Sequence, residues 1–278
     1  MAFLTVGKEN SADIRLYYED HGSGRPVVLI HGWPLSGASW ERQVAALLGA
    51  GQYRVITYDR RGFGRSSQPA EGYDYNTLAK DTYELLEKLD LKDATIVGFS
   101  MGGGEVARYM GDYNEGRVTK AVFASSIAPA LRKSGSNPEG VDPAIFEDIK
   151  RKIEKDRFVL LEWFVENFFN ADKLTDRVSK PAIQANFNVA ASASYQATLN
   201  CVDAWLEDFR DDIKEIKVPT LVIHGDSDRI LPIEATGART AKMIPGAKLH
   251  VIKDGPHGCN WTHAAEFNEA LLTFLEGK

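Results

Sequence analysis

Short apolar segments alternate with longer amphipathic segments along most of this 278-residue chain. A short, almost continuous apolar run is typical of a parallel strand buried on both faces, and apolar residues at helical spacing are typical of a helix that covers such a strand. The apolar runs lie at 26–32, 53–59, 94–100, 118–126, 219–226 and 247–252. The amphipathic segments lie at 39–51, 76–90, 103–113 and 263–278. The alternation predicts an α/β protein with a mostly parallel central sheet and helices on both faces.

Two local patterns add detail to this prediction. The segment at 13–20 (DIRLYYED) alternates apolar and polar residues, which predicts an edge or antiparallel strand. At the start of the helical segment 76–90, either Asn76 or Thr77 is available as the N-cap.

The strand–helix alternation stops between residues 128 and 213. This part begins with a loop rich in Pro, Gly and Ser at 128–143 and continues with aromatic-rich helical patterns at 144–170 and 195–213. We therefore expect a helical cap at 128–213, inserted into a core formed by 1–127 and 214–278 and lying over the end of the sheet.

Charge and composition exclude several classes of partner. The formal net charge is −6, whereas nucleic acids and anionic membranes attract clustered Lys and Arg. Residues 1–20 lack the basic and apolar regions of a signal peptide, and no stretch is long and apolar enough to predict a membrane span. Cys201 and Cys259 fit no zinc or CxxC spacing, so we expect free thiols. These features predict a cytoplasmic protein that binds neither nucleic acid nor membrane.

One serine lies among glycines where a predicted strand meets a predicted helix. Gly98, Ser100 and Gly102 form a G-x-S-x-G pattern after the apolar residues 94–97. A sharp strand-to-helix turn of this kind exposes its central hydroxyl at the sheet edge, beside a helix N-terminus that favours negative charge. The alternative is a glycine-rich helix start with Ser100 as its N-cap. We favour the interpretation of Ser100 as a nucleophile.

A serine hydroxyl needs a base to remove its proton, and the base needs an acid to orient it. His257 lies in the loop between the last predicted strand and the last predicted helix, so it is the candidate base. Asp226 and Asp228 follow the strand at 219–226. Asp228 lies further out on this loop and is the candidate acid, whereas Asp226 is expected to brace the turn. The order Ser100, Asp228, His257 along the chain is that of the α/β-hydrolases.

An acyl-transfer site also needs donors for the oxyanion of its tetrahedral intermediate. The backbone N–H of Met101, directly after the serine, is one candidate. The second is the N–H of Trp33 after an early strand, where Gly32 allows the backbone to turn; the alternative for this stretch is a plain strand-ending turn. His31 and His224 also end strands, and we expect backbone-facing or packing roles for both.

Several motifs together resemble one group within this superfamily. They are LIHGWP (29–34), ITYDRRGFGRS (56–66), VGFSMGGGEVARY (97–109), NPEG (137–140), HGDSDRILP (224–232) and GPHG (255–258). The chain is similar over nearly its whole length to the cofactor-free bacterial haloperoxidases of the α/β-hydrolase fold, which are themselves similar to aryl esterases and (+)-γ-lactamases. The triad motifs alone would specify only the superfamily; YDRRGFGRS and GFSMGGGE narrow the resemblance to this group.

The resemblance implies roles for particular residues. Ser100 would be the nucleophile, Asp228 the acid, His257 the base, and Trp33 and Met101 the oxyanion donors. It also implies a small apolar pocket beneath the cap. The expected lining residues are Trp33, Phe99, Met101, Phe164, Phe168 and Ile230; for the cap aromatics among them, packing in the core of the cap is the alternative.

The resemblance also implies the chemistry. A small carboxylic acid or ester acylates the serine without haem, metal or other cofactor, hydrogen peroxide replaces water, and the released peracid oxidises halide. Pro34, next to the oxyanion residue, is expected to favour peroxide over water. A γ-lactamase or amidase acting on small cyclic amides and a non-catalytic ligand-binding protein stay open as alternatives. Because members of the group are commonly oligomeric, a homo-oligomer is also expected.

Overall fold

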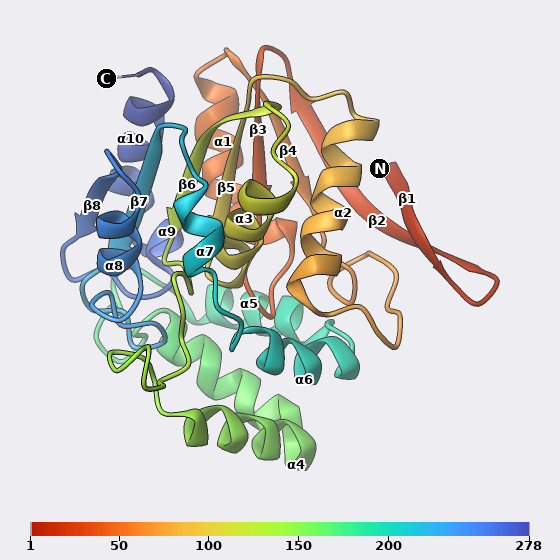
Figure 1. Ribbon diagram of the computed structural model, residues 1–278. Helices are drawn as coiled ribbons and strands as arrows, with labels where there is room; N and C mark the ends of the chain where they lie inside the picture. Colours follow the sequence, from red (N-terminus) through yellow and green to blue (C-terminus); the bar gives the residue numbers. More distant parts are fainter. Residues whose placement is uncertain (1, 278) are drawn as a thin grey trace.

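Eight strands form one sheet within residues 2–277, the part of the chain that the computed structural model describes. Their order across the sheet is β1-β2-β4-β3-β5-β6-β7-β8 (Figure 1). The strands are β1 (Ala2–Glu9), β2 (Ala12–Gly22), β3 (Arg25–Ile30), β4 (Tyr53–Tyr58), β5 (Ala94–Phe99), β6 (Val118–Ala124), β7 (Thr220–Gly225) and β8 (Lys248–Ile252). All neighbours from β4 to β8 are parallel, as the apolar runs predicted.

The antiparallel part of the sheet lies at its N-terminal edge. β2 pairs antiparallel with both β1 and β4, which confirms the antiparallel strand expected at 13–20. It is not the edge strand, however. Strand β1, which the sequence patterns did not single out, covers the outer edge of β2 because the chain reverses at Glu9–Ala12, with Asn10 in the left-handed region at φ 52°.

Helices cover both faces of the sheet, as predicted. On one face α2 and α3 pack side by side, with α7 against α3 and α8 against α7; on the other α1 packs against α10 (Figure 1). The helices outside the cap are the short 3-10 helix η1 (Gly37–Trp40), α1 (Glu41–Gly49), α2 (Tyr75–Lys88), α3 (Met101–Asp112), α7 (Arg210–Lys214), α8 (Gly237–Met243), α9 (Cys259–Thr262) and α10 (Ala264–Leu275).

The N-cap of α2 differs from the prediction. Asp74, rather than Asn76 or Thr77, caps this helix, because its carboxylate accepts a hydrogen bond from the Thr77 backbone N–H at 2.9 Å. The helix therefore begins at Tyr75, whose buried ring packs against Phe209.

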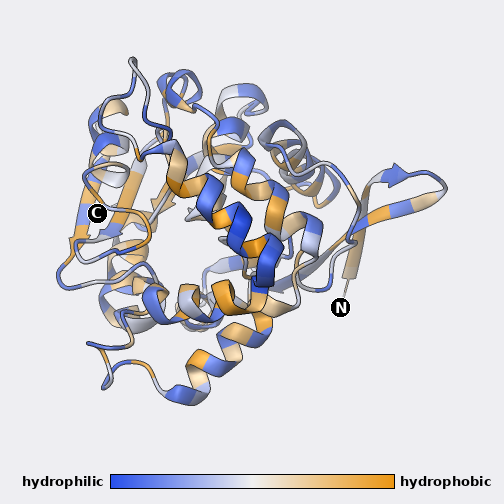
Figure 2. Ribbon diagram, turned by 90° about the horizontal axis from the view of Figure 1, so that it is seen from below, coloured by the Kyte–Doolittle hydropathy of each residue, from blue (hydrophilic) through white to orange (hydrophobic). Residues whose placement is uncertain are grey.

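Three further helices lie across the carboxyl ends of the parallel strands. They are α4 (Pro143–Phe168), α5 (Lys180–Ala191) and α6 (Tyr195–Ala204) (Figure 1). Seen from this side, the helices alternate hydrophobic and hydrophilic residues, as helices that pack on one side do (Figure 2). The division of the chain into a core of 1–127 and 214–278 and a cap of 128–213 stays a prediction, although these helices lie where the cap was expected.

Two helical patterns in this region are interrupted. The pattern at 144–170 breaks at Asp156 (φ −165°, ψ 97°), whose carboxylate accepts a hydrogen bond from the Phe158 N–H at 3.0 Å and so begins a second helical half. The pattern at 195–213 is divided between α6 and α7, because the Phe209 N–H donates to the Pro129 carbonyl at 2.9 Å and ties the intervening turn to another loop.

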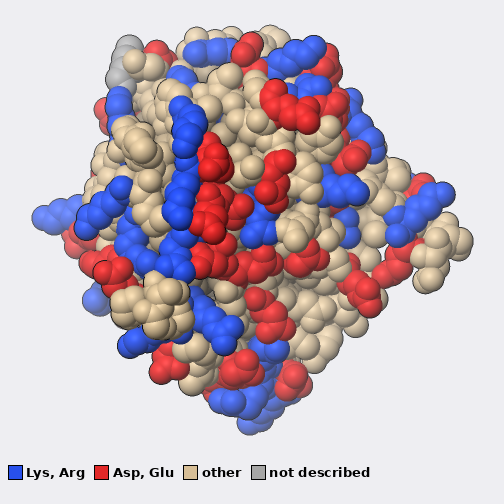
Figure 3. Space-filling view, in the orientation of Figure 1, with Lys and Arg blue, Asp and Glu red and all other residues tan. Residues whose placement is uncertain are grey.

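Cys201 and Cys259 are both free thiols, as predicted, and both are buried. Burial raises the pKa of each thiol to about 12. None of the described helices is long and apolar enough to cross a membrane. The face drawn in Figure 3 carries a stripe of Lys and Arg side chains beside a group of Asp and Glu side chains.

Candidate active site

The turn between β5 and α3 holds Ser100 in a strained backbone conformation. Its φ of +55° and ψ of −118° lie in a region that side chains other than glycine rarely adopt. The turn is also crowded, because a Cβ atom on Gly102 would lie 2.6 Å from the Ile30 carbonyl oxygen and one on Gly98 would clash with Gly102. The Ser100 side chain makes no capping hydrogen bond to α3, so the interpretation of this residue as a mere N-cap is wrong.

The structure brings together the three side chains that the sequence predicted to meet. The Ser100 hydroxyl oxygen lies 2.9 Å from Nε2 of His257, and Nδ1 of the same ring lies 2.7 Å from Oδ2 of Asp228. The side chains of His257 and Asp228 are fully buried. A hydrogen-bonded chain from alcohol to imidazole to carboxylate can move one proton from oxygen to nitrogen.

The Asp228 carboxylate is held by its own loop. Its Oδ1 accepts hydrogen bonds from the backbone N–H groups of Ile230 and Leu231, both at 2.8 Å. Burial by itself raises the pKa of Asp228, but the charge of His257 and side-chain contacts from His224 and His257 outweigh it and hold this pKa below its usual range. The carboxylate therefore stays ionised beside His257.

Asp226 braces the turn instead, as expected. One of its carboxylate oxygens accepts a hydrogen bond from the Asp254 backbone N–H at 2.7 Å, and so joins the loop after β7 to the loop after β8. These two loops carry Asp228 and His257, so Asp226 lies beside the hydrogen-bonded chain without being part of it.

Two backbone N–H groups at the serine have no acceptor within residues 2–277. They belong to Trp33, in the loop after β3, and to Met101, the first residue of α3. The Trp33 ring is fixed nearby, since Nε1 donates to the Thr198 carbonyl at 3.2 Å and the ring packs edge-on against Phe164 and Trp205. The Trp33–Pro34 peptide bond is cis. Both N–H groups remain free for an oxyanion.

An apolar cavity of about 100 Å³ opens onto Ser100 beneath α4. Of the expected lining residues, Trp33, Met101, Phe164 and Ile230 line it. Phe99 and Phe168 do not; their rings pack on the imidazole of His257, with centroids 5.1 and 5.4 Å away. The other lining side chains are Ile127, Leu131, Val141, Ile145, Phe146, Ile149, Trp205 and Leu231.

Comparison with known proteins identifies the family of this chain. The model of a family described as alpha/beta hydrolase fold matches residues 25–264. The chain belongs to the α/β-hydrolase family.

The relatives of this α/β-hydrolase place it in the haloperoxidase and esterase group. It is 42% identical to the non-heme chloroperoxidase CPO-A1 of Kitasatospora aureofaciens, covering 94% of this chain and 96% of the relative. It is 34% identical to the bifunctional esterase/perhydrolase DCH of Acinetobacter calcoaceticus, covering 94% and 96%. Among solved structures, the bromoperoxidase from Bacillus anthracis matches with a TM-score of 0.95 and 54% identity, covering 99% of each chain.

A buried polar network lies next to Trp33, at His31 and Gly32. Arg60 donates through Nη2 to the His31 carbonyl at 2.8 Å and through Nε to Glu105 at 2.7 Å, while its backbone N–H donates to His31 Nε2 at 2.9 Å. The His31 Nδ1 therefore carries the proton and donates to the Gly32 carbonyl at 2.8 Å. Burial, with a smaller effect of the Arg60 charge, holds the pKa of His31 well below its usual value. The backbone-facing role expected for His31 is confirmed.

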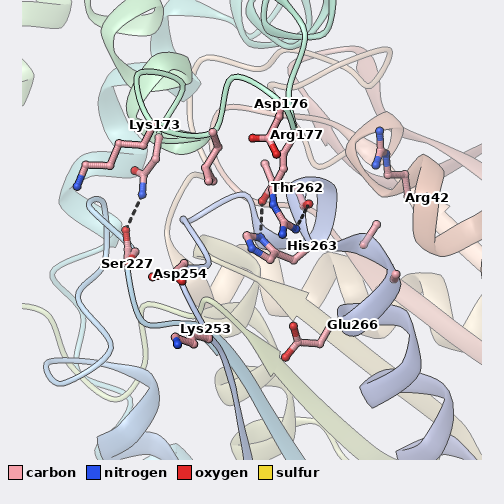
Figure 4. A pocket seen from close by; sticks show the side chains of 14 residues that line it. Arg42, Lys173, Asp176, Arg177, Ser227, Lys253, Asp254, Thr262, His263 and Glu266 are labelled. Atoms are coloured by element: carbon pink, nitrogen blue, oxygen red, sulfur yellow. Dashed lines mark hydrogen bonds between the residues drawn. The ribbon is translucent and has the colours of Figure 1, made fainter.

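A second hollow, of about 690 Å³, has a different set of lining residues (Figure 4). Its walls are polar, with Arg177 donating to the Thr262 carbonyl at 3.4 Å and Asn170 donating to the Ser227 carbonyl at 2.9 Å. None of Ser100, His257 and Asp228 lines it. The smaller apolar cavity is thus the one that meets the serine of this hydrolase. Across residues 2–277, no three His, Cys, Asp or Glu side chains gather as a metal-binding group.

Proposed function

We propose that this α/β-hydrolase cleaves small carboxylic esters through an acyl-enzyme and also forms peracids from carboxylic acids and hydrogen peroxide. The observation that carries the proposal is the hydrogen-bonded chain Ser100–His257–Asp228 opening into an apolar cavity. The names of the similar proteins, which include an esterase/perhydrolase and a chloroperoxidase, support the same chemistry. We propose Ser100 as nucleophile, His257 as base and Asp228 as the acid that orients it.

Acylation begins when the Ser100 hydroxyl gives its proton to Nε2 of His257 and its oxygen attacks the ester carbonyl. The developing oxyanion accepts hydrogen bonds from the N–H groups of Trp33 and Met101, which lower the barrier by about 3 kcal/mol each. Asp228 stabilises the imidazolium. The tetrahedral intermediate then expels the alcohol, which takes the proton from His257, and the acyl group stays on Ser100.

Deacylation repeats these steps with a second nucleophile. Water, deprotonated by His257, releases a carboxylic acid; hydrogen peroxide in the same position releases a peracid. In solution the peracid and a proton oxidise halide to hypohalous acid and return the carboxylic acid. A free carboxylic acid can acylate Ser100 by the reverse of hydrolysis, so acetate and peroxide together suffice as substrates.

The cavity supports a small substrate. Its volume of about 100 Å³ and its walls of aliphatic and aromatic side chains suit a short apolar acyl group better than a charged one. Ile145 lines it while remaining 51% exposed, so we place the entrance beside the first half of α4.

The test is a substrate panel run on the wild type and on Ser100→Ala. It comprises aryl esters of increasing acyl length, a bicyclic γ-lactam, and acetate with hydrogen peroxide and bromide. We expect turnover of the short esters and halogenation with acetate, both abolished in Ser100→Ala. Preferred turnover of the lactam would instead support an amidase. Absence of all turnover together with no labelling of Ser100 by a fluorophosphonate would support a ligand-binding protein. The oligomeric state stays a prediction that light scattering of the same sample tests.

A further inference from the structure

A second buried histidine contacts the acid of the proposed triad. His224 is the last side chain of β7, four positions before Asp228, and its side chain is fully buried. Its Nε2 lies 3.1 Å from Oδ2 of Asp228, the same oxygen that accepts the hydrogen bond from His257. The packing or backbone role expected from the sequence is therefore incomplete, and the proposed mechanism leaves this ring without a task.

The contacts of the His224 ring fix where its proton lies. Nε2 is 2.9 Å from the Leu231 carbonyl oxygen, which can only accept, so Nε2 carries a proton. Nδ1 is buried and has no hydrogen-bond partner in the described part of the chain. The start of α8 closes this side of the ring, since a Cβ atom on Gly237 would lie 2.5 Å from Nδ1. A second proton on Nδ1 would be a buried charge without an acceptor, so the ring is neutral with its proton on Nε2.

His224 acts on both the carboxylate and the turn that carries it. Its Nε2–H faces Oδ2 of Asp228 while it donates to the Leu231 carbonyl. The Leu231 backbone N–H in turn donates to Oδ1 of Asp228 at 2.8 Å. The strand end, the turn and the carboxylate thus form a closed set of contacts that leaves Oδ2 directed at His257.

We propose that His224 is a positioning residue of this hydrolase. Its Nε2–H holds the Asp228 carboxylate toward His257. Because it interacts with the same carboxylate oxygen, it also weakens the attraction of that oxygen for the proton on His257. This inference rests on the proposed function, because it concerns the groups that would move the proton. His224 itself touches neither substrate nor the reacting serine.

Few other groups can influence the Asp228–His257 pair. From the end of β5 and the turn after it come the Phe99 ring and the Ser100 hydroxyl, and from α4 comes the Phe168 ring. From α9 comes the Cys259 thiol, which lies 3.6 Å from the Ser125 hydroxyl, and burial raises its pKa to about 12. The thiol and the alcohol both stay uncharged near neutral pH, so His224 supplies the contact whose removal changes the basicity of Asp228.

Removal of the His224 N–H donor should shift the pH profile of kcat/KM in a defined direction. Without His224, Oδ2 of Asp228 has a single side-chain donor, becomes more basic and binds the His257 imidazolium more tightly. The acid limb of kcat/KM then moves to higher pH. The carboxylate also loses one of its restraints, so kcat falls while KM, which depends on the separate apolar cavity, changes little.

The experiment compares His224→Leu with His224→Gln. The Gln side chain places an N–H donor near the position of Nε2, and Leu places none. With an aryl acetate, we expect kcat of His224→Leu to fall about tenfold with an acid limb about half a pH unit higher, and His224→Gln to recover most of both. His31→Leu is the control, since His31 also ends a buried strand but contacts Gly32 and Arg60. It is expected to lower kcat and the melting temperature without moving the limb.

A wild-type kcat and acid limb in folded His224→Leu would overturn the inference, as would equal shifts in the Leu and Gln variants. If His224→Leu does not fold, two-bond ¹H–¹⁵N NMR of the wild type decides. A neutral ring with its proton on Nε2 is expected under the conditions of the kinetic assay, and an Nδ1–H tautomer or a doubly protonated ring there overturns the inference. The NMR readout needs no turnover, so it separates a failure of this inference from a failure of the proposed ester chemistry.

Discussion

The imidazole Nε2 of His257 lies 2.9 Å from the hydroxyl oxygen of Ser100, although 157 residues separate the two in the chain. The sheet creates this proximity, because β5 to β8 are successive parallel strands, so the loop after β5, which begins at Ser100, and the loop after β8, which carries His257, leave the same edge. Asp228 follows β7 and His257 follows β8, the next strand across. The carboxyl ends of three nearby strands thus supply the side chains that we propose as nucleophile, acid and base.

The first prediction concerns the tautomer of His257. Asp228→Asn should lower kcat for an aryl acetate about 10⁴-fold, because an amide can donate to Nδ1 and so places the imidazole proton on the nitrogen that must accept one. Asp226→Asn is the matched control in the same loop, where the carboxylate accepts only from the loop after β8 and from its neighbour Ser227. It should reduce kcat no more than about threefold. Similar losses in the two variants would contradict the assignment of Asp228 as the acid.

The second prediction concerns the space around the serine turn. Gly102→Ala should lower the free energy of unfolding by about 1–3 kcal/mol, because the added methyl group meets the Ile30 carbonyl oxygen at 2.6 Å. Gly49→Ala is the control, since a Cβ atom there, at the end of α1, has nothing within 4 Å. That variant should be stabilised by about 0.5–1 kcal/mol. Urea unfolding of both variants checks the difference, and a neutral Gly102→Ala would argue against a crowded turn.

Local sequence patterns predicted well which residues lie at the carboxyl edge of the sheet. An apolar run followed by Ser100, Asp228 or His257 places each residue at a strand end, and parallel strands share one edge. The N-terminal strand β1 was not predicted, because its side chains are only partly buried and its apolar pattern is weak. The cap of α2 at Asp74 was not predicted either, because Asn76 and Thr77 are also common caps.

The walls of the cavity depend on contacts that sequence patterns do not contain. A helical period tells which face of α4 is apolar, but not that Ile145, Phe146 and Ile149 cover Ser100. Phe99 was expected in the pocket from the family resemblance. Neighbours in a strand point to opposite sides, however, and its ring instead supports His257. The residues of the loop 128–143 that reach the cavity carry no periodic signal at all.

The third prediction concerns Pro34, next to one of the two free N–H groups. Pro34→Leu should lower the ratio of peracid formation to ester hydrolysis, because proline fixes φ near −65° and thereby the position of the neighbouring backbone carbonyl, which we propose holds peroxide. Parallel assays of ester hydrolysis and of bromide oxidation with acetate and peroxide measure the ratio. If both rates fall in proportion, Pro34 supports the loop without selecting peroxide.

The fourth prediction concerns the stability of the fold toward acid. The pKa of folded His31 lies below its unfolded value of about 6.5, so the unfolded chain binds more protons as the pH falls. The stabilisation is therefore fully present above about pH 6.5 and is lost progressively below it. His263, whose pKa burial and Arg177 also lower, adds to the same slope.

Substitution of His31 should flatten this dependence. The free energy of unfolding of His31→Gln should fall less than that of the wild type between about pH 7.5 and about pH 5, even though the variant is less stable at neutral pH. The exposed His21 gives the control, and His21→Gln should keep the wild-type slope. An unchanged slope in His31→Gln would show that other groups cause the loss of stability in acid.

The last prediction concerns the size of the acyl group. Ile149 lines the apolar cavity from α4, and its replacement by Ala removes three carbon atoms from the wall. Each additional buried methylene of a substrate contributes about 0.8 kcal/mol, so the new space should raise kcat/KM for an aryl hexanoate relative to the acetate about tenfold.

Lys152→Ala, one turn along the same helix and exposed, is the control and should leave the ratio unchanged. Because the substitution leaves Ser100, His257 and Asp228 unchanged, the acetate reaction should keep its kcat. If the hexanoate-to-acetate ratio of Ile149→Ala stays at the wild-type value, the acyl chain does not enter this cavity. The entrance that we place beside Ile145 would then lie elsewhere.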